Sequence, residues 1–236
     1  MYKVDKNIKI NPKNFFSKDI VKNFTSHINN SVPKYSNFCD GITSFSEYFI
    51  TDNSVVYDLG CSHASLLIDI VKKNKFKKNV NYYGLDSSQD MFLKAKQKTK
   101  KYKNIFIKKQ NILTNKFKKS DLIISNLTTQ FIKFSERRKL IKKIYNALNE
   151  KGAFIMVEKT NFKLPLIQSI ANDVHFDFKR ENNISGEEIL AKIRSMRGKL
   201  DPYDSGENIQ ILKNNGFKKV EIIFKELHFE MVIAIK

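Results

Sequence analysis

Short apolar runs alternate with amphipathic segments from about residue 54 onward, and this alternation restricts the fold more than any other feature of the chain. The apolar runs lie at 55–59, 81–85, 104–108, 121–125 and 153–158, and the amphipathic segments lie at 64–74, 88–100 and 135–148. Such alternation is typical of right-handed βαβ units that build a parallel sheet in an α/β fold. Two further strand-like runs, 219–224 and 228–235, have no helix between them, which predicts an antiparallel C-terminal hairpin.

The segment before this alternation predicts helices instead of strands. Apolar residues recur at spacings of three and four over 17–49, and Pro33 interrupts them, so we expect two helices. We interpret 1–50 as an N-terminal helical cap on a core that spans 51–236. No internal repeat or low-complexity linker divides the chain, so the sequence predicts a single domain over 1–236.

The alternation lapses after the strand-like run that ends near Lys159. A helical pattern returns only at 187–196. The residues between them that disfavour regular structure are Pro165, Asn182, Asn183 and Gly186. We therefore interpret about 160–200 as an insertion in the α/β core.

The composition excludes some classes of protein and leaves others open. Lysine and arginine number 43 against 24 aspartates and glutamates, a formal charge of +19, which excludes an acidic solvating protein. A hydrophobic content of 41% supplies a core. Positive charge of this size often binds nucleic-acid phosphates, yet only five of the 43 residues are arginine, whose fork suits phosphate best. We attribute the charge to compositional drift over a solvated surface and expect no tight direct RNA binding.

Neither a membrane span nor an export signal is visible in the sequence. No apolar run approaches the roughly 18 residues that a membrane span needs. The N-terminal residues contain no continuous apolar region and no small-residue cleavage site. The two cysteines, Cys39 and Cys61, have no metal-ligand spacing to each other or to histidines. We expect a cytoplasmic protein without a metal and without membrane contact.

The sharpest local signal is the sequence Val-Val-Tyr-Asp-Leu-Gly-Cys-Ser at 55–62, a buried strand that ends in Asp58 and Gly60 before a helix. Doubly wound sheets bind nucleotides at this position. The next strand ends at Asp86, whose carboxylate can accept hydrogen bonds from both hydroxyls of a ribose. The alternative is structural, with Asp58 capping the turn and Asp86 starting the next helix.

The same loop restricts the kind of nucleotide. A dinucleotide pyrophosphate needs the pattern GxGxxG, whereas residues 60–65 contain a single glycine, Gly60. The carboxylate of Asp58 would also repel a phosphate. It suits instead a cofactor that carries an ammonium and a sulfonium and no phosphate, as S-adenosyl-L-methionine does.

Five separated segments together resemble one known family. They are Ser31–Asn37, Val56–Ser62, Asn126–Phe131, Asp177–Arg180 and Arg194–Met196. In matching order they are similar to carboxy-S-adenosyl-L-methionine synthases. The resemblance implies a Rossmann-like class I methyltransferase fold with a mostly parallel seven-stranded sheet, in an enzyme that does not transfer a methyl group.

Members of this family convert S-adenosyl-L-methionine and prephenate to carboxy-S-adenosyl-L-methionine and phenylpyruvate. A transfer RNA carboxymethyltransferase then uses the product to modify the wobble uridine. Besides Asp58, the residues that the resemblance places at the cofactor are Tyr35, Gly60, Cys61, Ser62, Asp86, Ser87, Asn111, Ile112 and Asn126. It also implies that Arg194, the candidate catalytic residue, holds the added carboxylate from the neighbouring subunit of a homodimer.

The chain departs from the family pattern at three positions. Ala64 stands in place of a second glycine and could narrow the cofactor pocket, His63 replaces a small apolar residue, and Asn111 replaces an aspartate that faces the adenine. Two other interpretations stay open: an S-adenosyl-L-methionine-dependent RNA methyltransferase, and a catalytically silent cofactor-binding partner protein. We interpret the four histidines as ordinary surface or packing residues, at positions 27, 63, 175 and 228.

Overall fold

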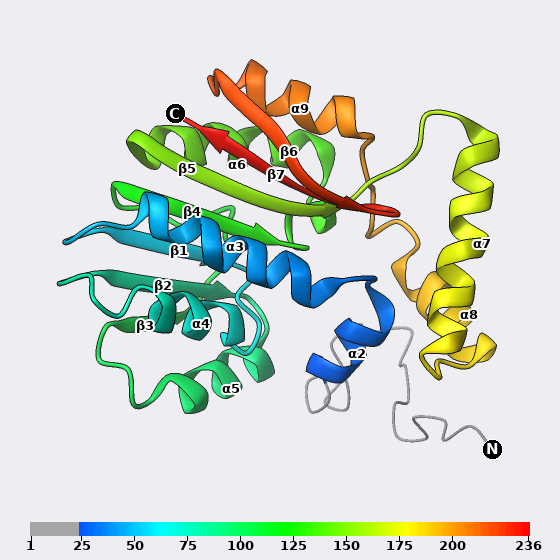
Figure 1. Ribbon diagram of the computed structural model, residues 1–236, viewed down its shortest axis with the longest axis horizontal. Coiled ribbons are helices and arrows are strands. Elements are labelled where there is room, and N and C mark those ends of the chain that lie inside the picture. The colour runs from blue at the N-terminus through cyan, green and yellow to red at the C-terminus, as the bar shows by residue number, and fades with distance from the viewer. Residues whose placement is uncertain (1–23) are drawn as a thin grey trace.

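The computed structural model describes residues 24–236, and its centre is a seven-stranded sheet (Figure 1). The strands are β1 (Val55–Leu59), β2 (Asn81–Asp86), β3 (Ile105–Lys109), β4 (Ser120–Asn126), β5 (Leu148–Lys159), β6 (Lys219–Glu226) and β7 (Phe229–Ile235), in the order β3-β2-β1-β4-β5-β7-β6. Strands β1 to β5 pair in parallel, and β7 pairs antiparallel with both β5 and β6. The predicted mostly parallel sheet with an antiparallel C-terminal hairpin is confirmed.

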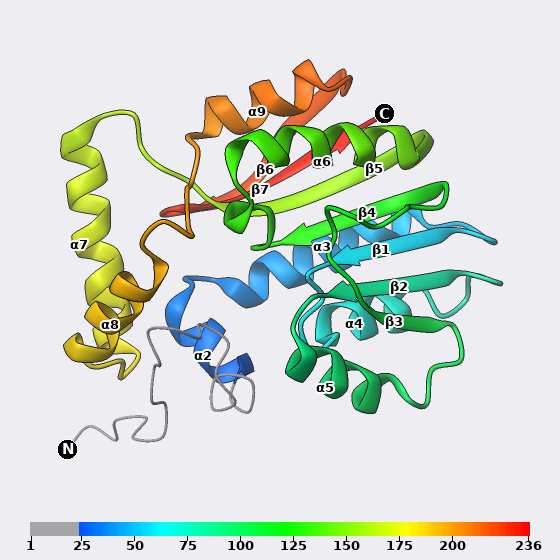
Figure 2. The same ribbon diagram turned by 180° about the vertical axis from the view of Figure 1, so that it is seen from behind.

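Helices cover both faces of the sheet, because side chains alternate between the faces along each strand. On one face lie α3 (Tyr35–Phe49), α4 (Ser65–Lys73) and α5 (Gln89–Thr99), and on the other lie α6 (Phe134–Ala147) and α9 (Ser205–Asn214) (Figures 1 and 2). In β4, Leu122 and Ile124 join the core cluster that includes α3 and α4, whereas Ile123 joins the cluster that includes α6. The sheet is therefore buried on both sides, as parallel strands require.

The N-terminal segment forms two helices, as predicted. Helix α2 (Phe24–Ser31) and helix α3 flank Pro33, and α2 lies beyond the carboxyl ends of the central strands (Figure 1). Residues 17–23, which the prediction also covers, lie outside the described residues. Phe38 and Ile42 of α3 are completely buried, so α3 belongs to the main core.

Two helices occupy the stretch in which the sequence indicated an insertion. Helix α7 (Pro165–Glu181) and helix α8 (Gly186–Met196) lie beyond the carboxyl end of β5 (Figure 1). The expectation that Pro165 interrupts regular structure is wrong. Pro165 lies in the first turn of α7, where an N–H has no partner within the helix, so proline fits. Asn182 caps the other end of α7, and Asn183 follows with a φ of 65°.

Reciprocal side-chain caps start the last two helices. The hydroxyl of Ser185 accepts the N–H of Glu188, and the carboxylate of Glu188 accepts the N–H of Ser185, at the start of α8. Asp204 and Glu207 form the same box at α9. Helix α9 was not predicted, although the Asp-x-x-Glu spacing at its start is a signal for a helix.

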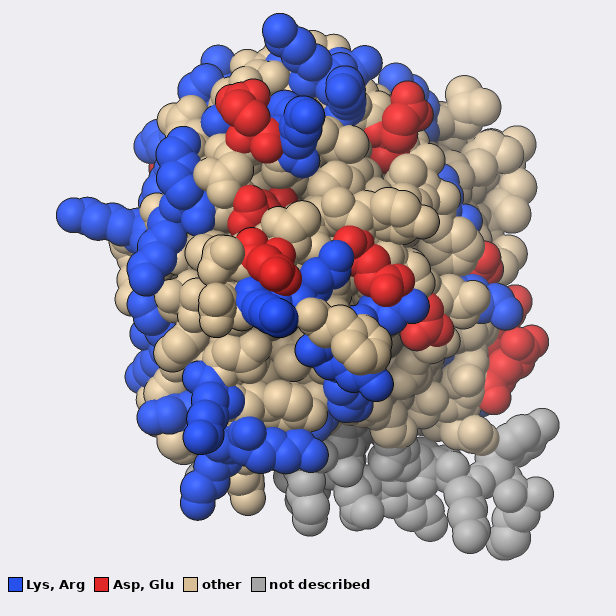
Figure 3. Space-filling model, turned by 60° about the vertical axis from the view of Figure 1, so that its left-hand side comes forward, with Lys and Arg blue, Asp and Glu red and all other residues tan. Residues whose placement is uncertain are grey.

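The surface charge is widely distributed. Figure 3 shows lysine and arginine side chains along the left and lower margins of one face, with acidic side chains among them near its centre. Basic residues also occupy the last turn of α4, at Lys72 and Lys73, where the helix dipole favours cations. Within residues 24–236, no helix has the length and apolar character that crossing a membrane requires.

Candidate functional site

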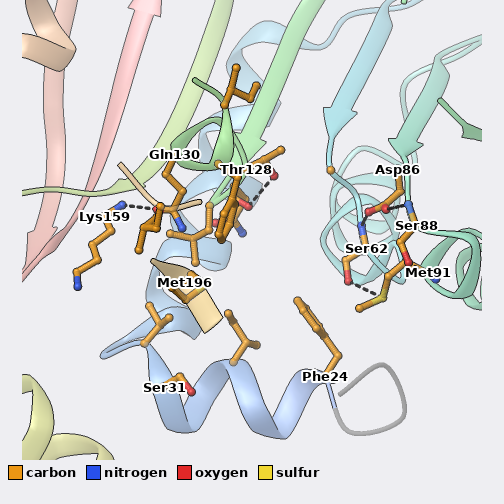
Figure 4. Close-up of a pocket in the computed structure, with 18 of the residues that line it drawn as sticks. Phe24, Ser31, Ser62, Asp86, Ser88, Met91, Thr128, Gln130, Lys159 and Met196 are labelled. Atoms are coloured by element: carbon orange, nitrogen blue, oxygen red, sulfur yellow. Dashed lines mark hydrogen bonds between the residues drawn. The ribbon is translucent and has the colours of Figure 1, made fainter. Parts of the chain in front are cut away.

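A cavity of about 820 Å³ opens at the carboxyl ends of β1, β2 and β4. This is the edge at which parallel α/β sheets bind their ligands. Residues of α2, α7 and α8 form its other walls, and Asp86 and Lys159 lie on opposite sides of it (Figure 4). Because small-molecule sites span roughly 300–1,000 Å³, this cavity has room for a nucleotide-sized ligand and a second small molecule.

The loop after β1 requires glycine at its first position. Gly60 has a φ of 74°, and a Cβ there would overlap the side chain of Thr128. Its N–H and that of Cys61 both donate to the carbonyl oxygen of Leu85, at 2.8 and 3.0 Å. The loop is therefore held against the end of β2, and its backbone faces the cavity without a side chain in between.

Asp86 organises the same corner. One carboxylate oxygen accepts the N–H of Ser62 at 2.9 Å, and the other accepts the N–H of Ser88 at 2.8 Å. Burial raises the pKa of Asp86, while these two hydrogen bonds favour its charged form. Each oxygen keeps a second lone pair for a ligand hydroxyl, so the carboxylate is oriented in advance.

Asn126, at the end of β4, presents an unsatisfied acceptor. Its side-chain amide donates to the hydroxyl of Tyr35 at 3.3 Å and to the sulfur of Cys39 at 3.7 Å. Its Oδ1 atom is buried and has no hydrogen-bond partner among the described residues. Burial without a partner is costly for a carbonyl oxygen, so this atom favours a ligand that donates a hydrogen bond.

Most of the residues predicted at the cofactor surround this cavity. Those that line it are Tyr35, Gly60, Ser62, Asp86, Ser87, Asn111, Ile112 and Asn126. Asp58, Cys61 and Arg194 are not among the lining residues. Cys61 is 5% exposed, and its sulfur lies close to the backbone of Gly84 in β2, so the side chain points into the fold.

Asp58 lies behind the cavity wall. It is 2% exposed, and burial, together with the nearby carboxylate of Asp86, raises its pKa to about 7. A cation bound beside these two carboxylates would favour the charged form of Asp58. Because Asp58 does not line the cavity, its charge would act on a bound ligand only through the electric field.

The three departures from the family pattern have distinct structural consequences. Ala64 is completely buried and has a φ of 60°, and it does not line the cavity, so its side chain does not narrow it. His63 Nε2 lies 2.8 Å from Thr25 Oγ1, so it joins the loop to α2. Asn111 Oδ1 accepts the N–H of Leu113 at 2.9 Å and closes a turn at the cavity rim.

The opposite end of the cavity carries positive charge that the sequence analysis did not assign to a site. Lys159 at the end of β5, Lys179 on α7 and Lys192 on α8 line this end, and we name them the lysine cluster. His27 and His175 line the same cavity, although they were interpreted as surface or packing residues. Among so many lysines, no local pattern marks these three.

Both histidines at this end are neutral near pH 7. Burial, together with the positive charges of neighbouring lysines, lowers the pKa of His27 and of His175 to about 3. His175 Nε2 lies 2.9 Å from the carbonyl oxygen of Ser31, and Lys192 Nζ lies 2.8 Å from His27 Nε2. These contacts join α2 to α7 and α8. In the described part of the chain, no group of three or more His, Cys, Asp or Glu side chains is arranged to hold a metal ion.

Comparisons of the sequence with known proteins indicate the family. A family model described as a methyltransferase domain matches residues 50–201. The carboxy-S-adenosyl-L-methionine synthase of Staphylococcus epidermidis is 36% identical over 222 residues, which cover 94% of this chain and 96% of that protein. The synthase of Nautilia profundicola is 34% identical over 226 residues, with 94% of each chain covered.

Comparisons of the structure indicate the fold. A methyltransferase from Aquifex aeolicus, described as S-adenosyl-L-methionine-dependent, matches with a TM-score of 0.59 at 16% identity over 96% of this chain and 99% of its own. An O-methyltransferase family protein from Burkholderia thailandensis matches with a TM-score of 0.66 at 13% identity over 94% of this chain and 60% of its own. These likenesses show a class I methyltransferase fold. The sequence relatives go further, and they show that this chain is an enzyme of the carboxy-S-adenosyl-L-methionine synthase family.

Proposed function

We propose that this enzyme converts S-adenosyl-L-methionine and prephenate to carboxy-S-adenosyl-L-methionine and phenylpyruvate. The names of the relatives support the product, because the match extends over nearly the whole of each chain. The observation that carries the proposal is the cavity itself, which joins a nucleotide-binding sheet edge to an end lined by lysines. A cationic cofactor and an anionic second substrate fit such a cavity in one orientation only.

The proposed reaction balances between these two substrates. Prephenate loses carbon dioxide and hydroxide from its ring, which leaves phenylpyruvate. The hydroxide takes a proton from the sulfonium methyl group and becomes water. The methyl carbon keeps the electron pair of the broken C–H bond and forms a bond to carbon dioxide. Such a carbon nucleophile must be shielded from bulk water, which favours a deep cavity over an open cleft.

We propose that S-adenosyl-L-methionine binds at the end of the cavity that contains Asp86. In this arrangement the carboxylate of Asp86 accepts hydrogen bonds from the ribose hydroxyls. The unsatisfied Oδ1 of Asn126 accepts a hydrogen bond from the ammonium. Gly60 lets the backbone approach the ligand, and Asp58 contributes negative charge from behind the wall. The other proposed contacts are Tyr35, Ser62, Ser87, Asn111 and Ile112. Cys61, whose side chain points into the fold, would contribute only through its backbone.

We also propose that Arg194 acts across a homodimer. Arg194 is exposed on α8 and does not line the cavity of its own chain, which fits a role in a partner's site. The neighbouring helix α7 leaves Leu166, Ile170 and Val174 exposed at 70%, 49% and 49%. These residues recur at spacings of four along α7, so they share one apolar face that a second subunit would cover.

The mass of the bound small molecule tests the proposed function. Denaturation of freshly purified protein should release a ligand heavier than S-adenosyl-L-methionine by one carbon dioxide. Protein with Asp86→Ala, prepared in the same way, serves as the control and should release little ligand. Release of unmodified cofactor alone, even after prephenate is added, would contradict the synthase activity.

Mixed dimers test the role of Arg194. We expect Asp86→Ala and Arg194→Ala proteins to be inactive separately and to regain part of the native activity after subunit exchange. One mixed dimer then contains one site in which both residues are intact. Absence of recovery, in a mixture shown to have exchanged subunits, would mean that Arg194 does not act across the interface.

We propose that a transfer RNA carboxymethyltransferase uses the product. We also propose that the synthase described here does not itself bind RNA tightly. On the face that Figure 3 shows, acidic side chains lie among the basic ones, which supports weak, non-specific RNA contact there. Nanomolar binding of transfer RNA at physiological salt, measured by filter binding, would contradict this view. A cytoplasmic location is also proposed, and the two free cysteines support it.

A further inference from the structure

The lysine cluster gathers positive charge from three distant parts of the chain at one end of the cavity. Lys159 ends β5, Lys179 lies in the last turn of α7, and Lys192 lies on α8. All three are partly buried and line the cavity, and Lys159 extends from the wall opposite Asp86 (Figure 4). The fold therefore brings like charges together where a ligand has access.

This arrangement is electrostatically unfavourable, and it lowers the pKa of the lysines. Burial lowers the pKa of Lys179 to about 8, and the positive charge of Lys159 contributes. Burial, then Lys179 and Lys159, lower the pKa of Lys192 to about 7. Among the described residues, neither Lys159 nor Lys179 lies within ion-pair distance of a carboxylate. An anion in the cavity would offset the cost of burying the charged lysines and would reduce the repulsion between them.

Neutral polar groups contact the cluster among the described residues. Lys192 Nζ lies 2.8 Å from His27 Nε2 and 3.4 Å from the hydroxyl of Ser31. His175 faces the cluster from α7 and His228 faces it from the turn before β7, and burial lowers the pKa of each, to about 3 and about 4. A solvated set of surface lysines would show neither the shared cavity nor this depression.

We propose that the lysine cluster binds the carboxylate of prephenate that remains in phenylpyruvate, and thereby directs the ring carboxyl toward the cofactor. This inference rests on the proposed function. The ring carboxylate becomes neutral carbon dioxide, so a cation paired with it would stabilise the substrate more than the transition state and slow the reaction. The side-chain carboxylate stays charged throughout, so lysines can hold it without that penalty.

Steady-state kinetics of Lys179 variants test the proposal. Lys179→Gln should raise the KM for prephenate about tenfold or more, because a charged hydrogen-bond partner is lost. The turnover number should change much less, and the affinity for S-adenosyl-L-methionine should stay native. Lys179→Arg keeps the charge, so its KM for prephenate should stay close to the native value. Lys199→Gln is the matched control, since Lys199 is exposed just after α8 and does not line the cavity.

Product inhibition distinguishes the two carboxylates. Phenylpyruvate contains only the side-chain carboxylate, so its inhibition should weaken in Lys179→Gln by about the same factor as the KM rises. Lys159→Gln serves the same comparison should Lys179→Gln fail to fold, which a thermal melt would show.

Each outcome has a definite meaning. If the native enzyme makes no carboxy-S-adenosyl-L-methionine from prephenate, the proposed function itself fails. If the native enzyme is active and Lys179→Gln keeps the native KM, the lysine inference is overturned while the function stands. If the KM rises and inhibition by phenylpyruvate does not change, the cluster holds the departing carboxylate, and our assignment is wrong.

Discussion

The two ends of the cavity carry opposite charge, and they are held in place in different ways. At the acidic end, neighbouring backbone N–H groups fix both oxygens of Asp86. At the basic end, Lys179 of α7 comes near Lys159 at the end of β5 through the packing of α7 against α2 and α8, and in the described residues no carboxylate lies within ion-pair distance of either lysine. The acidic end is therefore preorganised by backbone hydrogen bonds within the first two βα units, whereas the lysine cluster depends on the packing of more distant elements.

The largest expected effect is a loss of cofactor affinity when the acidic end of the cavity is altered and the basic end is not. Asp86→Ala should weaken S-adenosyl-L-methionine binding by about 2–4 kcal/mol, because hydrogen bonds to a charged group contribute roughly 1.5–3 kcal/mol each and overlap in effect. Titration calorimetry measures this affinity, and Lys179→Gln is the control from the other end, expected to bind the cofactor normally. Equal losses in both variants would mean that the cavity does not divide as we describe.

The next effect tests the rigidity of the acidic end. Gly60→Ala combines a left-handed backbone with a clash against Thr128, so it should lower the free energy of unfolding by about 2–4 kcal/mol. Gly198, after α8, has a similar φ of 68° but open space around its Cβ, so Gly198→Ala should lose only about 1 kcal/mol. Urea denaturation measures both. Similar losses would show that the loop after β1 yields to a side chain.

A smaller expected effect is the pH dependence of stability, to which Lys179 at the basic end and Asp58 at the acidic end contribute with opposite sign. The folded-state pKa of Lys179 is about 8, below its ordinary 10.5, so the unfolded chain binds more protons between these values. The contribution of Lys179 to stability therefore rises as pH increases from about 8 to 10.5. Asp58 has the opposite sign, because its pKa is raised from 3.8 to about 7, and its contribution falls over that interval. In the ligand-free protein, Asp58 and Lys179 therefore both contribute least to the stability of the fold near pH 7 to 8.

Replacement of Lys179 isolates the basic part of this curve. Lys179→Met should stabilise the ligand-free protein by about 1 kcal/mol at pH 7, and the gain should shrink toward pH 10 as native Lys179 loses its proton. Thermal melts across this pH range measure the effect, with Lys199→Met as the control for the loss of one positive charge. Destabilisation at pH 7 would show that an anionic group of the protein already satisfies Lys179.

The smallest effect concerns the same loop as Gly60. Ala64 adopts a left-handed φ of 60°. Ala64→Gly should raise the free energy of unfolding by about 0.5–1 kcal/mol, since the relief of strain exceeds the extra freedom that glycine gives the unfolded chain. Affinity for S-adenosyl-L-methionine should not change, because Ala64 does not line the cavity. Tighter binding in this variant would restore the expectation that Ala64 narrows the site.

The amino-acid sequence alone determined the sheet and the acidic end. Alternation of apolar and amphipathic segments records which side chains each strand buries, and a parallel sheet brings the ends of consecutive strands to one edge. The sequence therefore predicts Asp86 and Gly60 at the ligand-binding edge of the sheet, and both line the cavity. The hairpin of β6 and β7 followed from the same reasoning, because the link between these strands is too short for a crossover.

Only the tertiary structure decided the basic end. Helix α7 was missed because Pro165 was interpreted as a breaker, when it begins the helix. Without α7, nothing in the sequence places Lys179 beside Lys159, and one lysine among 43 basic residues has no local signature. The proposed role of Arg194 across a dimer interface would likewise depend on packing, because Arg194 does not line the cavity of its own chain. Local sequence encodes backbone hydrogen bonding and burial, whereas the meeting of like charges from distant segments follows from packing, which no short pattern records.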